Sequence, residues 1–183
     1  MDRPPVLVVD ASVGVAALTP ERHSAWARAV LGDSRVSGVR LVVPSLFWLE
    51  LIHALSRGGR TGEELIAALR ELDEFGIQTR DLDRADLLLS IDLMERHRLS
   101  AYDAVYLSLA ETMNGRLATA DGQLIVAAQQ RAIAPGASLH RGAIQEPEGG
   151  YAADPTWARW PGTSAYLAKL RAQAEEAARS ARS

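Results

Sequence analysis

The stretch Val6-Leu7-Val8-Val9-Asp10-Ala11-Ser12 decides the fold class of this chain. Four aliphatic residues, three of them β-branched, stand between Pro5 and Asp10, and such a run predicts a short buried strand. Asp10-Ala11-Ser12 then opens a segment of helical character. The segment therefore predicts a strand that leads directly into a helix, with a carboxylate at the junction.

The same alternation of short strands and helices continues along the chain. Pro44 suits the first turn of a helix, because proline lacks only an N–H that is unpaired there. Thr61 and Glu64 have the spacing of a helix start with acidic residues in its first turn. Short apolar strands between helices predict an α/β fold with a mainly parallel sheet covered on both faces. Further strands are expected at 41–43, 76–80, 116–119 and 132–134, and helices at 20–31, 44–56, 61–74, 83–97, 100–113 and from 121 onward.

Composition narrows the function classes. The chain has 183 residues, of which 48% are hydrophobic and 23% charged, as in a single globular domain. It has no cysteine, which excludes disulfides and thiolate chemistry. The net charge of −3 argues against a passive nucleic-acid binder. We find no secretory signal and no apolar run long enough for a membrane helix, so we expect a cytoplasmic protein with no membrane partner.

The texture of the sequence changes after Pro135. Proline- and glycine-containing stretches at 147–150 and 160–162 are typical of a linker, and 163–179 is rich in alanine with apolar residues at helical spacing. We therefore expect a domain over 1–135, followed over 136–183 by a linker and an amphipathic helix appended to it. This helix either packs on its own domain or serves in dimer or partner contact.

Four acidic residues stand where a carboxylate is functionally suggestive. Asp10 and Asp121 each follow a predicted strand, and ligands of parallel sheets bind at the carboxyl ends of strands. Glu50 and Asp103 lie in helical segments that are mostly apolar, where a carboxylate is costly unless it is paired, neutralised or bound to a metal. Each acid also has a structural explanation. The alternatives are helix N-caps for Asp10 and Asp121, a capping box for Ser100 with Asp103, and an ion pair of Glu50 with His53.

Four segments taken together resemble the PIN-domain nucleases, and most closely the VapC-type toxins of toxin–antitoxin pairs. Their order and spacing fit that family over roughly residues 6–134. The segments are Val8-Val9-Asp10-Ala11-Ser12, Pro44-Ser45-Leu46-Phe47-Trp48-Leu49-Glu50-Leu51, Ser100-Ala101-Tyr102-Asp103-Ala104-Val105-Tyr106-Leu107 and Leu117-Ala118-Thr119-Ala120-Asp121-Gly122-Gln123-Leu124.

The resemblance implies an α/β/α sandwich with a parallel sheet, to which a C-terminal helical extension is added here. It implies an acidic pocket that binds Mg²⁺, for which Mn²⁺ can substitute, with Asp10 and Asp103 nearest the metal. Glu50 and Asp121 would complete the site directly or through water. Ser12 and Thr119 match the family's hydroxyl positions, where they orient a carboxylate or bind a phosphate, although both could be local turn or cap hydroxyls.

The function that the resemblance implies is a magnesium-dependent endoribonuclease, the toxin of a type II toxin–antitoxin system. It would hydrolyse single-stranded or looped RNA to a 5′-phosphate and a 3′-hydroxyl, form a homodimer and bind a cognate antitoxin protein. The alternatives are a housekeeping RNA-processing or DNA-acting nuclease without antitoxin, and a metal-free interaction module. The arginines at 57, 60, 80 and 98 are candidate phosphate contacts or solvated surface.

Overall fold

The computed structural model describes residues 4–137. The chain divides into two units between Tyr151 and Ala152, and every described residue belongs to the first. The expected linker and amphipathic helix lie almost entirely outside the described residues, and the domain boundary at 135 stays a prediction.

A five-stranded parallel sheet forms the centre of the described unit, with strand order β3-β2-β1-β4-β5. Strand β1, predicted over 6–9, has those bounds, and its four residues are all buried. Every predicted strand is present, so the expectation of an α/β fold with a parallel sheet is confirmed. The strands are β1 (Val6–Val9), β2 (Arg40–Pro44), β3 (Gln78–Arg80), β4 (Arg116–Ala118) and β5 (Ala132–Ile133).

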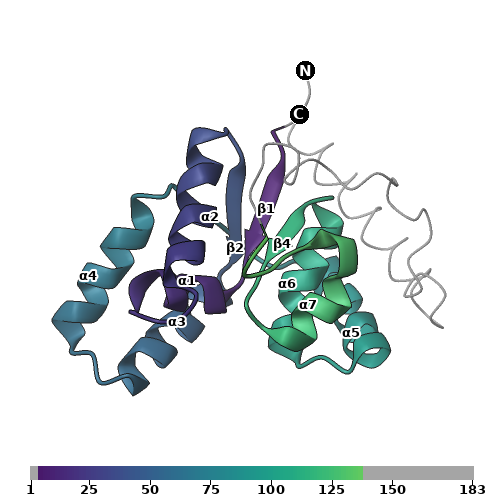
Figure 1. Cartoon of the computed structure of the whole chain (residues 1–183). Coiled ribbons are helices and arrows are strands. Elements are labelled where there is room, and N and C mark those ends of the chain that lie inside the picture. The colour runs from purple at the N-terminus through teal and green to yellow at the C-terminus, as the bar shows by residue number, and fades with distance from the viewer. Residues whose placement is uncertain (1–3, 138–183) are drawn as a thin grey trace, which may run out of the picture. The chain divides into compact units, whose positions relative to one another are not determined.

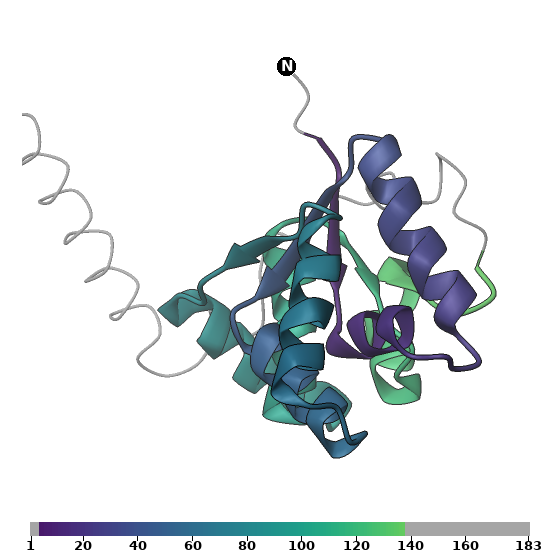
Figure 2. The same cartoon turned by 90° about the vertical axis from the view of Figure 1, so that its left-hand side faces the viewer.

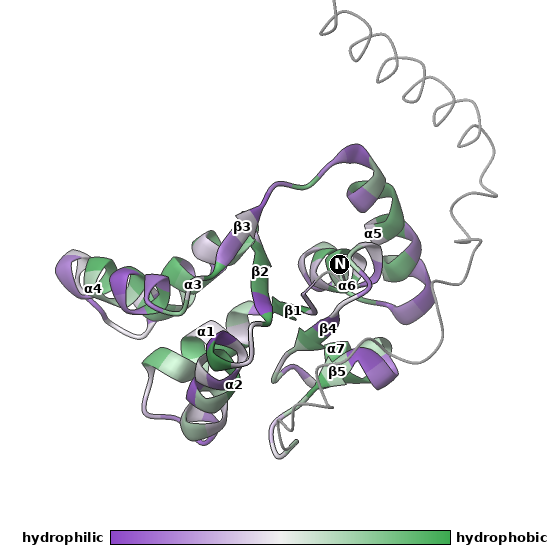
Figure 3. Cartoon of the chain, turned by 90° about the horizontal axis from the view of Figure 1, so that it is seen from above, coloured by the Kyte–Doolittle hydropathy of each residue, from purple (hydrophilic) through white to green (hydrophobic). Residues whose placement is uncertain are grey.

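Helices cover the sheet on both sides. Helices α1 and α2 lie on one side and α5 and α6 on the other, and most of β2 between them is coloured as hydrophobic (Figure 3). Helices α3 and α4 extend away from the sheet, with α4 outermost (Figures 1 and 2). The helices are α1 (Ala11–Leu18), α2 (Ser24–Val36), α3 (Leu46–Arg57), α4 (Gly62–Asp73), α5 (Arg84–His97), α6 (Ala101–Thr112) and α7 (Gly122–Ala128), with a 3-10 turn η1 at Gln129–Arg131.

Two sequence-based boundaries are wrong. Pro44 does not begin a helix: it is the last residue of β2 and pairs with Arg80 of β3. A strand end tolerates the missing N–H of proline, and α3 begins two residues later. The helix expected over 20–31 runs instead over Ser24–Val36, because its buried face continues through Ser34.

Gly14 lets helix α3 approach α1 closely. A Cβ atom added at Gly14 would lie 2.8 Å from Cζ of Phe47, whose side chain is fully buried. This close packing brings the helix that carries Glu50 against the helix that begins at Ala11. No helix within residues 4–137 has the length and apolar character needed to cross a bilayer.

Candidate active site

The order of the sheet reverses between β1 and β4. From β1 the chain builds β2 and β3 on one side, and then β4 and β5 on the other. Such a switch point leaves a crevice at the carboxyl ends of the two central strands. Asp10 follows β1 and Asp121 follows β4, and the Asp10 N–H donates to the carbonyl of Ala118 at 3.0 Å. The sequence pointed to both acids without showing that their strands are neighbours, and the pairing of β1 with β4 brings them to one edge.

Asp10 is buried, with only 6% of its surface exposed. Its Oδ2 accepts hydrogen bonds from Ser12 Oγ at 2.5 Å and from Thr119 Oγ1 at 2.8 Å. Although it occupies the N-cap position of α1, its side chain makes no capping hydrogen bond, so the interpretation of Asp10 as a cap is wrong. Burial raises the pKa of Asp10, the two hydroxyls oppose that effect, and the charge of Asp103 adds to it.

The two hydroxyls are themselves held by the backbone after β4. Ser12 Oγ accepts from the N–H of Ala120, and Thr119 Oγ1 accepts from the N–H of Asp121, each at 3.0 Å. Each hydroxyl therefore uses its acceptor capacity on the backbone and turns its proton toward Asp10. This arrangement fixes the orientation of the Asp10 carboxylate.

Glu50 is half-buried and accepts a hydrogen bond from the hydroxyl of Tyr106 at 2.5 Å. It forms no ion pair with His53 among the described residues, so that interpretation is wrong. Burial raises the pKa of Glu50, the Tyr106 hydrogen bond lowers it, and the charges of Asp10 and Asp103 raise it. Burial and the neighbouring Glu50 also raise the pKa of Tyr106, so the phenol stays a proton donor.

Sequence reasoning assigned Tyr106 no role, although it lies in one of the four segments that carry the family resemblance. Its side chain is fully buried, and it lies three residues after Asp103 on α6. Residues three apart are neighbours on a helix surface. This spacing was the available signal, but the partner Glu50 lies on another helix and could not be found from sequence.

Asp103 is half-buried and combines a capping contact with a charge interaction. Its backbone N–H donates to Ser100 Oγ at 3.1 Å, and Ser100 Oγ donates to Asp103 Oδ2 at 2.7 Å. Ser100 is therefore the N-cap of α6, but the expected capping box with Asp103 is incomplete, because the Asp103 side chain accepts from the Ser100 hydroxyl and not from its backbone N–H. Because the charge of Asp103 raises the pKa of both Asp10 and Glu50, these three carboxylates interact electrostatically.

Asp121 differs from the other three acids. It is exposed, and its Oδ1 accepts from the N–H of Leu124 at 2.8 Å, so it caps helix α7 as the structural alternative expected. The N–H of Asp121 donates to Thr119 Oγ1, which connects Asp121 to the cluster. The charge of Asp121 is not among those that shift the pKa of Asp10 or Glu50.

The acidic cluster has the character of a site for a hard cation. None of the four carboxylates forms an ion pair with a basic side chain within residues 4–137, and the charge effects on Asp10 and Glu50 come from other carboxylates. A divalent cation would remove that repulsion, and oxygen ligands suit magnesium. Residues 4–137 contain no group of three or more histidines or acids that could hold a metal ion by themselves. A metal site at these carboxylates therefore stays a prediction, for which an ion held by one or two carboxylates and water is the arrangement that magnesium prefers.

Comparison with known families agrees with the fold. A model of the PIN domain matches residues 7–129, which include all four carboxylates. The chain belongs to the PIN-domain family.

Individual relatives of this PIN domain point to the VapC proteins. It is 32% identical over 123 residues to "Ribonuclease VapC3" of Pyrobaculum aerophilum, covering 64% of this chain and 91% of the relative. Its fold is similar to VapBC2 of Rickettsia felis, solved with a promoter DNA fragment, at 16% identity and a TM-score of 0.55, covering 70% and 96% of the two chains. It is also similar to Mycobacterium tuberculosis VapC20, described as a sarcin-ricin loop cleaving toxin, at 16% identity and a TM-score of 0.55, covering 66% and 94%.

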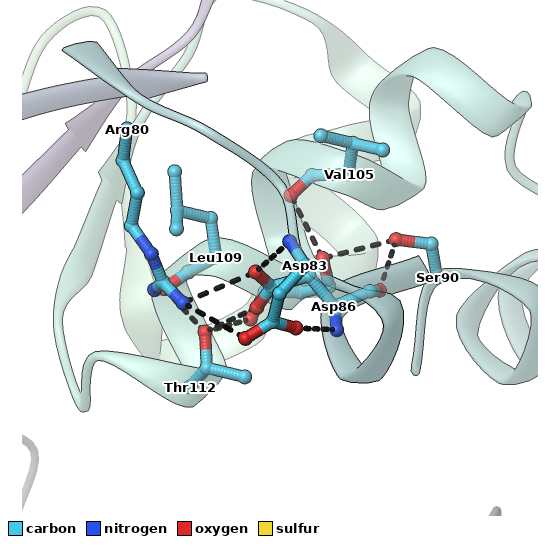
Figure 4. Close-up of polar contacts among 8 residues, drawn as sticks. Arg80, Asp83, Asp86, Ser90, Val105, Leu109 and Thr112 are labelled. Atoms are coloured by element: carbon cyan, nitrogen blue, oxygen red, sulfur yellow. Dashed lines mark hydrogen bonds and ion pairs between the residues drawn. The ribbon is translucent and has the colours of Figure 1, made fainter. Parts of the chain in front are cut away.

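Arg80 of this PIN domain serves the fold. Its guanidinium lies 3.1 Å from Oδ2 of Asp86, whose side chain is 1% exposed, and 3.9 Å from Asp83 (Figure 4). Asp86 also accepts from the N–H of Asp83 at 3.1 Å and from Thr112 Oγ1 at 3.2 Å. Arg80 thus joins the end of β3 to α5 and α6. Similarly, the guanidinium of Arg60 donates to the carbonyl of Leu18.

Proposed function

We propose that this PIN domain is a divalent-metal-dependent endoribonuclease and the toxin of a toxin–antitoxin pair. The observation that carries the proposal is the buried Asp10 at the sheet's switch point, which interacts with Asp103 and Glu50 and has no basic partner among the described residues. Buried like charges are unfavourable unless the site holds a cation or a proton. The relatives' names, Ribonuclease VapC3 and sarcin-ricin loop cleaving toxin, support RNA as the substrate class.

Each residue has a role in this proposal. Asp10 and Asp103 would hold Mg²⁺ or Mn²⁺, with Glu50 and Asp121 completing the site directly or through water. When bound, the cation supplies Lewis-acid activation of the attacking water and screens the phosphodiester. The products would be a 5′-phosphate and a 3′-hydroxyl.

Residues next to the carboxylates would maintain the site. Ser12 and Thr119 keep Asp10 in one orientation through their hydrogen bonds to Oδ2. Tyr106 lowers the pKa of Glu50 and so favours the ionised form that a cation needs. These hydroxyls therefore act on the acids and not on the substrate.

An antitoxin partner follows from the comparison with toxin–antitoxin complexes such as VapBC2. We propose that an antitoxin protein covers the acidic edge of the sheet and that the active toxin is a homodimer in the cytoplasm. A small reading frame next to the gene of this chain would support the partner. Its product should copurify with the full chain and suppress cleavage.

The test of the enzyme is cleavage of single-stranded RNA by the purified full chain with magnesium or manganese. We expect chelator to stop cleavage, and Asp10→Asn and Asp103→Asn each to slow it about a hundredfold or more, the usual cost of removing an electrostatic contact at a reacting centre. Asp33→Asn, at an exposed position on α2, is the matched control and should cleave at the parent rate. Variants at positions 10 and 103 that cleave as fast as the parent would show that the activity is a contaminant.

The toxin role is tested separately in cells. We expect induction of the chain alone to arrest growth of a bacterial host, and Asp10→Asn to relieve the arrest. Normal growth together with RNA cleavage in vitro would instead identify a housekeeping nuclease.

A further inference from the structure

A hollow of about 400 Å³ adjoins the acidic cluster. It lies between α1, the connection from α1 to α2, and α3, and it includes Ala120 from the segment after β4. Ser12 and Glu50 line it, so the hollow opens directly onto the carboxylates described above. Its volume falls within the range of small-molecule sites, which begins at about 300 Å³.

The lining of the hollow combines apolar walls with a polar rim. Small aliphatic side chains such as Ala11, Val15 and Ala16 form one wall. Glu21 and His53 are exposed, whereas His23 is half-buried. An apolar hollow with a few polar groups at its rim is compatible with a heterocyclic ligand, since such sites use apolar contact for affinity and polar groups for orientation.

The polar groups indicate which heterocycle fits. The ring of His23 is held by an edge contact with Trp26, at a centroid distance of 6.5 Å and an interplanar angle of 80°. Proteins recognise unpaired RNA bases by stacking them on aromatic or imidazole rings and hydrogen-bonding their edges. An ionised glutamate only accepts hydrogen bonds, so it favours amino groups and disfavours carbonyl oxygens.

We propose that this hollow is a subsite for a nucleobase next to the scissile phosphate, and that Glu21 selects a base with an exocyclic amino group over uracil. The proposal rests on the proposed function, because the hollow is assigned to the RNA that the acidic cluster would cut. Adenine, cytosine and guanine each present an exocyclic amino group, whereas uracil presents a single ring N–H flanked by two carbonyls that a carboxylate disfavours. His23 and His53 would contact the ring of the bound base.

The first experiment measures base discrimination. After the cut is mapped in one oligonucleotide, the nucleotide on each side is varied in turn, and kcat/KM is compared between the amino-bearing bases and uracil. We expect a preference over uracil at one of the two positions, and Glu21→Gln should reduce it roughly tenfold, since an amide can also donate to a carbonyl. Glu95→Gln, at an exposed position on α5, is the control and should retain the preference.

The second experiment needs no cleavage. The histidine ring signals of the full chain are followed by NMR during titration with guanosine or uridine 5′-monophosphate in chelator. We expect guanosine monophosphate to shift the signals of His23 and His53 and to leave His97, on α5, unchanged. Uridine monophosphate should shift them less, and Glu21→Gln should remove the difference.

The two experiments separate the two proposals. Cleavage by the wild-type chain with no base preference at either position, or with a preference that Glu21→Gln leaves unchanged, overturns the subsite. A lack of any RNA cleavage overturns the proposed nuclease and with it the subsite, whereas cleavage with equal shifts of His23, His53 and His97, or with none, overturns the subsite alone.

Discussion

Replacing Tyr106 by phenylalanine tests how a buried hydroxyl controls the pKa of the half-buried Glu50 carboxylate. The side chain of Tyr106 is fully buried, and phenylalanine fills nearly the same volume, so the change removes only the hydroxyl that donates to Glu50. A hydrogen bond to a charged group contributes about 1.5 to 3 kcal/mol. Because Glu50 is half-buried and can take up water in exchange, we expect a loss of unfolding free energy near or just below the lower end of that range, about 1 to 2 kcal/mol.

The same change should alter the pH dependence of cleavage. The hydrogen bond from Tyr106 lowers the pKa of Glu50, while burial raises it above the ordinary value of 4.5. Without the hydroxyl the pKa rises further, so Glu50 stays protonated to a higher pH. If the ionised form serves the reaction, the acidic limb of the rate profile moves to higher pH in the Tyr106→Phe chain.

Urea denaturation of the metal-free chain, followed by circular dichroism, measures the loss of stability. The matched control is Tyr102→Phe, on the same helix but 62% exposed, which should unfold like the parent. Rates of RNA cleavage between pH 5 and 8 measure the second effect. A Tyr106→Phe chain with the parent's midpoint and the parent's pH profile would refute the reasoning.

Three further substitutions follow from the structure. The pKa of Asp10 is raised above 3.8, so the folded metal-free chain should lose stability as the pH rises from about 4 toward the pKa of Asp10 in the folded chain. Asp10→Asn should weaken this dependence of stability on pH in denaturation curves collected with chelator. Asp86→Ala removes the acceptor of a buried ion pair and should lower the unfolding free energy, measured by urea denaturation, by about 3 kcal/mol. Asp83→Ala, at the N-cap of the same helix, should lower it by about 1 kcal/mol. Equal losses would contradict the assignment of Arg80 and Asp86 as a buried ion pair. Gly14→Ala places a Cβ 2.8 Å from Phe47 Cζ and should lower the unfolding free energy by about 1 to 3 kcal/mol. An unchanged thermal midpoint would show that α1 and α3 can move apart without a loss of stability.

Local sequence determined most of the elements and predicted the positions of the site residues. The run Val6–Val9 between Pro5 and Asp10 could be read as a buried strand because β-branched residues favour extended backbone and the flanking residues interrupt it. Thr61 with Glu64 marked the start of α4, since a capping box forms from residues three apart, and the structure contains it. In the same way, the order of the four acidic segments was sufficient to indicate the family that the domain model matches.

Tertiary structure decided how these positions meet. Pro44 lies in strand β2 because it pairs with Arg80 of β3, and Arg80 also forms an ion pair with Asp86. Neither contact can be read from the residues next to Pro44 or Arg80 in the sequence. The hydrogen bond from Tyr106 to Glu50 joins α6 to α3 through two residues that are 56 positions apart in the chain. Short-range preferences act over a few residues, whereas neighbours across a sheet or between helices depend on how apolar faces are buried together. The sequence alone therefore predicted the four carboxylates as a site, and the packing of β1 against β4 and of α3 against α1 determined which of them interact.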